Sequence, residues 1–226
     1  MAELAERLAA IRERIAAACA AAGRSGAEVE LLAVSKTFPM EAVAEACEAG
    51  QRVFGESRQQ EAAPKIAGLP RDLEWHFIGS LQRNKVRKVL ADFACIHSVD
   101  SLRLAESLDR VAGEEGKRPP VYLEVNIAGE ESKGGFSPAG LIVAAEQLPR
   151  LANLEIRGLM AIPPEGESRR WFAATRELRD RLQAASGLPL PGLSMGMSGD
   201  FEDAIAEGAT IVRVGSALFG HRDYTL

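Results

Sequence analysis

Apolar residues recur at helical spacing near the start of the chain. Leu4, Leu8, Ile11 and Ile15 lie three or four positions apart in an alanine-rich stretch, which places them on one face of an α-helix. Gly23 follows them, and glycine commonly ends a helix. The pattern predicts an amphipathic helix at the N-terminus.

After Gly23, short apolar runs alternate with helical patterns as far as residue 220. The apolar runs are predicted strands, at residues 31–35, 52–55, 74–79, 95–99, 121–127, 154–161, 192–195 and 210–214. Helical stretches between them include residues 40–49, 101–112, 138–148, 169–185 and 201–207. No linker, repeat or low-complexity tract interrupts the series, so we expect one domain over residues 1–226.

One lysine stands where a predicted strand ends. Lys36 follows the apolar run 31–35, and Pro39, whose fixed φ suits a first helical turn, comes shortly after it. Desolvation lowers the pKa of a lysine amine, and such an amine is suited to forming a Schiff base. The alternative is a lysine that merely extends from a strand end into solvent.

Two loops near the other end of the chain are rich in glycine and serine. Ser198 and Gly199 follow the predicted strand at 192–195, and Gly215 and Ser216 follow the strand at 210–214. Backbone N–H groups at a helix start are unpaired, and with serine hydroxyls they donate hydrogen bonds to anions. The two loops are therefore a candidate phosphate site. The alternative for each serine is an ordinary helix N-cap.

The regular alternation of strands and helices implies a parallel sheet, either open and doubly wound or closed into a barrel. Eight predicted strands match a (β/α)8 barrel, and 226 residues lie within its size range. In a closed barrel the first and eighth strands are neighbours, so the Lys36 loop and both serine loops meet at one mouth. We therefore predict the α/β class: a single (β/α)8 TIM barrel with an extra N-terminal helix.

Composition excludes several classes of protein. The chain is 46% hydrophobic with a formal net charge of −5, and it has no basic stripe with interleaved aromatics, so we expect no nucleic-acid partner. No apolar run approaches the ~18 residues of a membrane span, and the N-terminus does not resemble a signal peptide. The odd number of well-separated cysteines is typical of a reduced, cytoplasmic protein, and no metal-ligand spacing with the histidines is apparent.

Arg213, within the last predicted strand, completes a set of residues suited to pyridoxal 5′-phosphate. Lys36 would form the internal aldimine, and the loops that carry Ser198 and Ser216 would hold the phosphate. An arginine that faces the pyridine nitrogen keeps that nitrogen unprotonated because its own charge is permanent. An aspartate there would instead strengthen the ring as an electron sink. A structural ion pair is the alternative role for Arg213.

These segments, with others, closely resemble the pyridoxal phosphate homeostasis protein family, relatives of the barrel domain of alanine racemase. The matching segments are residues 32–36, 54–56, 75–82, 84–85, 157–162, 193–198 and 212–215. The resemblance implies a barrel like the alanine racemase N-terminal domain, of the fold-type III class of cofactor proteins, with an aldimine at Lys36. It also implies that Arg213 faces the ring nitrogen and that the phosphate is bound by Ser198, Gly215 and Ser216, with Gly199 as a further candidate.

The chain departs from the family pattern at three positions. Ser57 stands where many relatives have asparagine, so a cofactor contact is either lost or replaced by a water. Ser80 occupies the place of a frequent proline, and Ser216 that of a frequent threonine, with the hydroxyl retained. His76, on the third predicted strand, has two open interpretations: it lines the barrel mouth, or it is a hydrogen-bonded core histidine.

Two classes of function remain for such a site. One is a non-catalytic protein that stores, buffers or delivers pyridoxal phosphate, with apoenzymes as candidate recipients. The other is a pyridoxal phosphate-dependent racemase or decarboxylase of low activity; a class I aldolase that uses Lys36 without cofactor is a weaker third alternative. Racemisation needs a second base, which alanine racemases take from a following β-domain, whereas only residues 221–226 follow Gly220 here. This and Arg213 favour the homeostasis hypothesis, without efficient amino-acid turnover.

Overall fold

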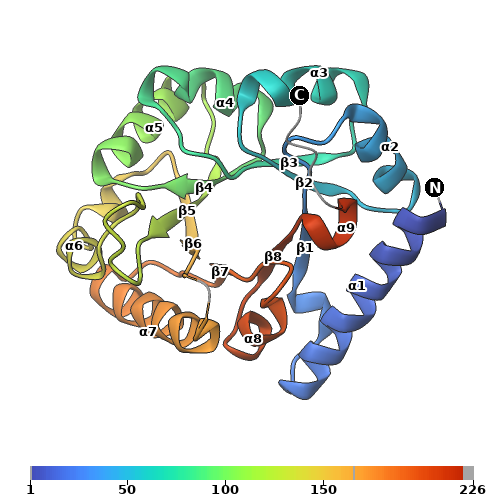
Figure 1. Ribbon diagram of the computed structural model, residues 1–226. Coiled ribbons are helices and arrows are strands. Elements are labelled where there is room, and N and C mark those ends of the chain that lie inside the picture. Colours follow the sequence, from blue (N-terminus) through green and yellow to red (C-terminus); the bar gives the residue numbers. More distant parts are fainter. Residues whose placement is uncertain (1, 165, 221–226) are drawn as a thin grey trace.

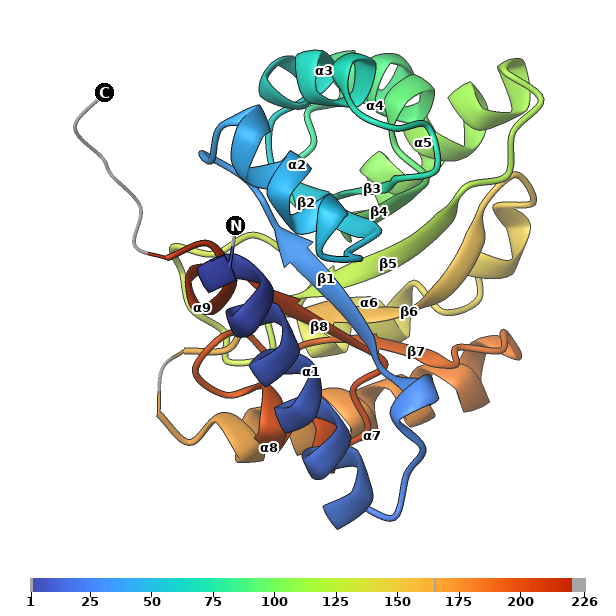
Figure 2. The same ribbon diagram turned by 90° about the vertical axis from the view of Figure 1, so that its right-hand side faces the viewer.

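Eight parallel strands form a closed barrel, in which each strand pairs with the next and β8 pairs with β1 (Figures 1 and 2). The computed structural model describes residues 2–164 and 166–220. The strands are β1 Glu30–Val34, β2 Val53–Glu56, β3 Glu74–Phe77, β4 Cys95–Val99, β5 Pro120–Val125, β6 Glu155–Ala161, β7 Gly192–Ser194 and β8 Ile211–Val214. The predicted (β/α)8 barrel is confirmed, and every predicted strand overlaps its observed counterpart.

Helices surround the barrel on its outer side (Figure 1). They are α1 Ala2–Ala21, α2 Met40–Glu48, α3 Gln59–Gly68, α4 Val86–Asp92, α5 Leu102–Glu114, α6 Pro138–Val143, α7 Ser168–Ser186, α8 Phe201–Ala206 and α9 Ser216–Phe219. The helix predicted over residues 138–148 is wrong in its length, since α6 ends at Val143 and a short 3-10 segment, Leu148–Arg150, follows turns. Pro149 has no N–H and disfavours helical backbone at the residue before it, so the helix cannot run through this point.

Neighbouring residues of each strand face opposite sides of the barrel wall. Inside the barrel lies a small apolar cluster, whereas the alternate residues belong to a larger core beneath the helices. The inner cluster consists of Leu32, Cys95, Tyr122, Met160 and Ile211. Because parallel strands are buried on both faces, the sequence shows them as continuous apolar runs rather than as alternating patterns.

The N-terminal helix covers the seam where β8 pairs with β1. Helix α1 contacts α2, α8 and α9 and lies outside β1 in both views (Figures 1 and 2). Arg14 stacks over the ring of Phe201 and pairs with Glu202, which fastens α1 to α8. Helix α9 has only four residues, so α1 supplies the cover that the last helix of a barrel usually provides. The predicted apolar stripe is buried, at Leu4, Leu8, Ile11 and Ile15.

All eight strands end at the same mouth of the barrel. Figure 2 shows the strands running toward the side on which α9 lies. The loops after β1, β7 and β8 therefore meet there, as the closed barrel requires. None of the helices in the described parts of the chain is long and apolar enough to cross a membrane.

Candidate functional site

A cavity of about 290 Å³ opens at the mouth where the strands end. Its residues come from β1, β6 and β8 and from the loops that follow β1, β3, β6, β7 and β8. Small-molecule sites in barrels of this kind lie at the carboxyl ends of the strands. The lining residues are Val34, Lys36, Ile78, Met160, Ile162, Met197, Ser198, Gly199, Arg213, Gly215 and Ser216.

Lys36 is positioned by a tight turn between β1 and α2. The backbone N–H of Ser35 donates to Gly55 O at 3.0 Å, which continues the sheet past the end of β1, and Phe38 N donates to Ser35 O at 3.1 Å. Thr37 has a φ of 71°, an uncommon value for a residue other than glycine. Lys36 is partly buried. Pro39 is the N-cap of α2 rather than its first helical residue, with a φ of −70°.

A buried ion pair braces this turn from the outer side of the barrel. Lys65 of α3 lies 2.6 Å from Glu56 of β2, and their side chains are 8% and 0% exposed. Lys65 Nζ also donates to Ser35 O at 3.0 Å, and Ser35 Oγ donates to Glu56 Oε1 at 2.8 Å. Three elements therefore meet at the residue that precedes Lys36. A buried pair of this kind adds little net stability, because the cost of desolvating both charges offsets their attraction.

Arg213 projects into the barrel from β8 and is 5% exposed. Its Nη1 donates to Ser194 O at 2.6 Å and to Ser194 Oγ at 2.8 Å, and its Nη2 donates to Ala161 O at 2.9 Å. Within residues 2–164 and 166–220, no carboxylate forms an ion pair with it. Burial lowers the pKa of Arg213 to about 10, so the guanidinium is still charged at neutral pH.

Among carboxylates, Glu124 has the largest electrostatic effect on Arg213, and the pKa of Glu124 is itself shifted by its surroundings. Burial and the nearby Asp100 raise the pKa of Glu124, while Arg213 lowers it. The guanidinium has five N–H donors, and the bonds to Ser194 and Ala161 use three of them. A buried cation that is bonded mainly to neutral oxygens gives the cavity a positive potential.

The loops after β7 and β8 are joined by a serine. Ser198 Oγ accepts a hydrogen bond from Ala217 N at 3.4 Å, so the loop after β7 contacts the first turn of α9. Gly196 has a φ of 91°, and a Cβ there would lie 2.5 Å from the Cβ of Ala204, so only glycine fits this turn. The N-cap residues of α8 and α9 are Asp200 and Gly215. Neither serine is therefore the N-cap residue of the helix that follows it, although Ser198 Oγ bonds to a backbone N–H in the first turn of α9.

The structure brings the main predicted site residues around one cavity. Lys36, Arg213 and the residues of the two C-terminal loops, Ser198, Gly199, Gly215 and Ser216, all line it. Two further candidates lie elsewhere. Ser57 lines a separate cavity beside Ser80 and Lys85. His76 is buried inside the barrel below the mouth and is bonded to His97 and Glu74. Residues 221–226, which the sequence analysis weighed as the chain's last segment, lie outside the described residues.

Sequence reasoning missed several residues of the site. The apolar walls of the cavity were not singled out, because Ile78 lies within a predicted strand and Ile162 directly follows one, where apolar residues are ordinary. Lys65 was also missed. A usable signal existed, because this lysine stands three positions after the buried Ala62 on the inner face of α3.

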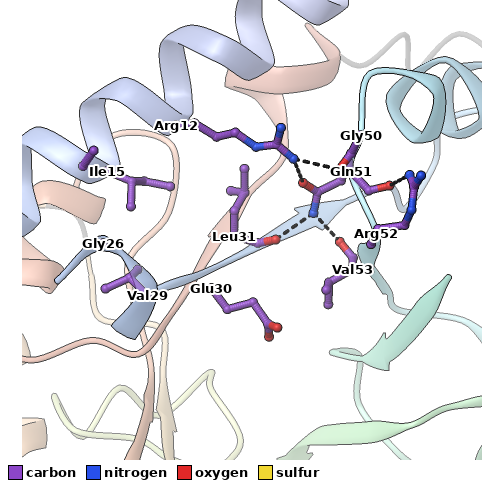
Figure 3. Close-up of a pocket in the computed structure, with 11 residues that line it drawn as sticks. Arg12, Ile15, Gly26, Val29, Glu30, Leu31, Gly50, Gln51, Arg52 and Val53 are labelled. Carbon is purple, nitrogen blue, oxygen red and sulfur yellow. Dashed lines mark hydrogen bonds between the residues drawn. The ribbon is translucent and has the colours of Figure 1, made fainter. Parts of the chain in front are cut away.

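A second cavity, of about 410 Å³, lies at the opposite mouth of the barrel (Figure 3). Its polar groups bond to one another: Gln51 Nε2 donates to Leu31 O at 2.7 Å and to Val53 O at 2.8 Å, and Arg12 donates to Gly50 O at 2.9 Å. Figure 3 shows the Glu30 side chain extending away from this bonded group. The arrangement ties the starts of β1 and β2 to α1 and has the character of a structural contact.

Comparison with known proteins identifies the family. The alanine racemase N-terminal domain family matches residues 7–223. The chain is 47% identical over 224 residues to the pyridoxal phosphate homeostasis protein of Aquifex aeolicus, with 97% of this chain and 98% of the relative covered. The chain belongs to the pyridoxal phosphate homeostasis protein family. The Pseudomonas aeruginosa member is 50% identical, with 99% of this chain and 98% of the relative covered.

Solved structures agree with this family assignment. PipY of Synechococcus elongatus without pyridoxal phosphate aligns with a TM-score of 0.88 at 46% identity, over 96% of this chain and 100% of PipY. PipY with pyridoxal phosphate bound aligns with a TM-score of 0.84 at 45% identity, with the same shares covered. Alanine racemase of Bartonella henselae shares the fold, with a TM-score of 0.74 at 17% identity over 98% of this chain and 61% of the racemase.

The buried pair beneath the lysine turn yields a stability prediction. Lys65→Met leaves the Glu56 carboxylate buried without its cation, and we expect the free energy of unfolding to fall by about 3–5 kcal/mol. The double variant Glu56→Leu/Lys65→Met removes both charges and should be clearly more stable than the single variant. Urea denaturation measures both values. Arg58→Met, which removes the exposed Arg58–Glu61 pair, is the control and should leave stability nearly unchanged. A double variant that is no more stable than Lys65→Met would contradict the pairing of these two charges.

Proposed function

We propose that this protein binds pyridoxal phosphate in the Lys36 cavity, holds it covalently through Lys36, and serves the intracellular homeostasis of the cofactor. The single observation that carries the proposal is the convergence of an amine, a buried cation and two serine-bearing loops on one cavity. PipY, 45% identical to this chain, has been solved with pyridoxal phosphate bound. Storage and delivery to apoenzymes in the cytoplasm follow from the same proposal.

The donor set of the cavity fits this cofactor. Pyridoxal phosphate presents an aldehyde, an aromatic ring with one nitrogen, and a phosphate dianion. The cavity offers the Lys36 amine, the Arg213 guanidinium, and the hydroxyls of Ser198 and Ser216. Its remaining walls are aliphatic or methionine side chains, which suit the face of a ring. Its volume lies at the lower end of the ~300–1,000 Å³ of small-molecule sites.

When bound, the cofactor supplies an aldehyde that condenses with a deprotonated lysine amine to give a carbon–nitrogen double bond and water. Lys36 is the lysine at the cavity, and the turn braced by Lys65 and Glu56 fixes the place from which its side chain extends. Ser198 and Ser216 donate to the phosphate oxygens. Arg213 donates a hydrogen bond to the ring nitrogen, and because it keeps its own proton, the nitrogen stays unprotonated.

The ionisable groups at the cavity favour binding of the cofactor over catalysis with it. Among the described lining residues, only Lys36 and Arg213 carry a titratable or charged side chain. A two-base reaction needs a second general base opposite the lysine, and a general acid or base contributes ~10²–10⁴-fold to rate. The relatives are named as homeostasis proteins rather than as enzymes. Both observations support binding without efficient amino-acid turnover.

The first prediction is that Lys36 carries the cofactor. Borohydride treatment of the loaded protein should fix a pyridoxyl group on the Lys36 peptide, and Lys36→Ala should abolish the visible absorption of the lysine-bound cofactor. Peptide mass spectrometry locates the label. Lys133→Ala is the matched control, because Lys133 is another partly exposed loop lysine, and it should keep the absorption. A label mainly on Lys85 or Lys133 would contradict the proposal.

The second prediction concerns the phosphate. Ser198→Ala and Ser216→Ala should each weaken the binding of pyridoxal phosphate by about 1.5–3 kcal/mol, the usual value of a hydrogen bond to a charged group. Equilibrium dialysis provides the measurement. Pyridoxal, which lacks the phosphate, is the control ligand and should lose much less affinity. Equal losses for the two ligands would place the phosphate elsewhere.

The third prediction is that the loaded protein turns over amino acids poorly. Neither described ionisable group at the cavity can serve as the second base, and Arg213 leaves the ring a weak electron sink. Solvent-deuterium exchange at the α-carbon of a panel of amino acids measures this, together with assays for racemised and decarboxylated products. A turnover near ~10 s⁻¹, an ordinary enzymatic rate, would overturn the homeostasis proposal.

A further inference from the structure

Five polar side chains form a continuous hydrogen-bonded chain through the interior of the barrel. Arg213 Nη1 donates to Ser194 Oγ at 2.8 Å, and Ser194 Oγ lies 2.8 Å from His97 Nδ1. His97 Nε2 lies 3.0 Å from His76 Nδ1, and His76 Nε2 lies 2.9 Å from Glu74 Oε1. This hydrogen-bonded chain starts at the candidate cofactor cavity with Arg213 and ends at Glu74, the first residue of β3, at the opposite mouth.

The chain is sealed from solvent except at its far end. Ser194 and His97 are fully buried and His76 is 3% exposed, whereas the side chain of Glu74 is 51% exposed. The rings of His97 and Tyr122 lie 4.7 Å apart, which closes the chain on the β5 side. Other titratable or charged groups surround these residues. Glu30 and Cys95 interact with Glu74 at the far mouth, where Tyr122 and Arg157 interact with Cys95 in turn. Glu124 and Asp200 interact with Arg213, and Asp100 interacts with Glu124.

The residues at the two ends of the hydrogen-bonded chain determine which partner donates in each bond. Arg213 can only donate, and the hydrogen bond from His76 lowers the pKa of Glu74, whose carboxylate therefore accepts. Burial, with a smaller electrostatic contribution from its neighbours, lowers the pKa of His97 well below its usual value, so this imidazole is neutral.

One arrangement of protons gives the Ser194 hydroxyl an acceptor within these bonded side chains. His76 donates from Nε2 to Glu74, His97 donates from Nε2 to His76, and the Ser194 hydroxyl donates to His97 Nδ1. Ser194 Oγ then presents its lone pairs to Arg213. These tautomers are assigned from the hydrogen-bond network. Chains of this kind polarise their members, so that each bond strengthens the next.

We propose that His97 and His76 are positioning residues that hold the Ser194 hydroxyl toward Arg213, and that the Glu74 carboxylate at the far mouth fixes the direction of the chain. The inference rests on the proposed function in one respect: the group whose environment the chain sets is the guanidinium that faces the cofactor ring. A substitution of Glu74 at the opposite mouth of the barrel then changes the absorption of the bound cofactor without contacting the cofactor.

A metal site is the competing interpretation of the same residues. His76, His97 and Cys95 each offer a ligand atom, and these atoms lie within 4.8 Å of one another. A metal would need the facing nitrogens of both imidazoles bare, whereas at 3.0 Å they share one proton. Burial raises the pKa of the Cys95 thiol, which opposes the thiolate that a metal requires. The observations therefore favour the hydrogen-bonded chain.

Nitrogen-15 NMR of the histidine side chains in the full-length, cofactor-free protein tests whether the proposed hydrogen bonds form. We expect both imidazoles to be protonated at Nε2 and bare at Nδ1, and one equivalent of Zn²⁺ to leave these signals in place. Protonation of His97 at Nδ1, or loss of the shared proton on addition of Zn²⁺, would overturn the proposal.

Absorption of the cofactor-loaded protein tests the coupling to the ring. Glu74→Gln and His97→Gln should each shift the pH midpoint of the visible absorption by about 0.3–1 unit. Glu155→Gln is the matched control, because Glu155 begins β6 and pairs with Arg157 rather than with the chain, and its midpoint should equal that of the unaltered protein. Glu74→Gln, at a half-exposed position, keeps the test valid if His97→Gln does not fold. Unshifted midpoints in the variants that fold would overturn the proposal.

Failure of the proposed function gives a different result. If the unaltered protein takes up no cofactor, the proposed function is wrong. The nitrogen-15 NMR signals of the Arg213 guanidinium in the cofactor-free protein then test whether the hydrogen-bonded chain positions Arg213. A change of these signals in Glu74→Gln, with none in Glu155→Gln, supports the positioning role. Identical signals in both variants contradict it.

Discussion

The pairing of β1 with β8 is the constraint on which the site depends. Its register places Leu32 opposite Arg213 and Ala33 opposite Val214, so Lys36, a few residues further along, follows β1 at the mouth where Gly215 and Ser216 follow β8. In an open, doubly wound sheet the first and last strands are not neighbours, so the lysine would be separated from the loop after β8. Helix α1 protects this closure, because it buries its apolar stripe over the seam that the four-residue α9 leaves uncovered.

Two buried cations near the mouth are accommodated in different ways. On the outer side of the barrel wall, Lys65 meets Glu56 directly, so the pair is neutral as a unit and its effect is geometric. On the inner side, Arg213 is bonded to the carbonyls of Ser194 and Ala161 and to one hydroxyl. Neutral oxygens solvate this cation without cancelling its charge, so the cavity keeps an affinity for an anion or for an acceptor nitrogen.

The sequence predicts those parts of the site that are fixed by position along a strand. Lys36 and Ser198 follow apolar runs, and parallel strands in a closed barrel bring such positions to one mouth whatever the side chains between them. Residues whose role depends on partners far away in the chain could not be predicted in this way. His97 and Ser194 are 97 positions apart and meet only across the barrel, and within one strand each looks like an ordinary polar interruption.

Predictions from local sequence were incomplete where a turn or a tertiary contact determines the structure. Pro39 suits the first helical turn of α2, yet it is the N-cap, because the turn after Ser35 uses Lys36, Thr37 and Phe38 before the helix begins. The interpretation of His76 as a core histidine was one of two, and only its bonds to His97 and Glu74 distinguish them. The role predicted for Arg213 came from its place in the last strand and from the family resemblance, and it stays a prediction. The structure adds that no ion pair to Arg213 forms among the described residues.

Under the proposed function, the properties that retain the cofactor are those that limit its chemistry. A guanidinium that stays charged even in a buried position can donate to the ring nitrogen but cannot transfer a proton to it, so the ring is bound firmly and remains a weak electron sink. The hydrogen-bonded chain behind Arg213 strengthens this bias, because it supplies acceptors to the guanidinium from the protein side and leaves its remaining donors for the cavity. Replacing Arg213 by an acid would reverse both effects together, since a carboxyl group that shares a proton with the ring nitrogen strengthens the sink and removes the buried cation. Retention and reactivity therefore depend on the same side chain.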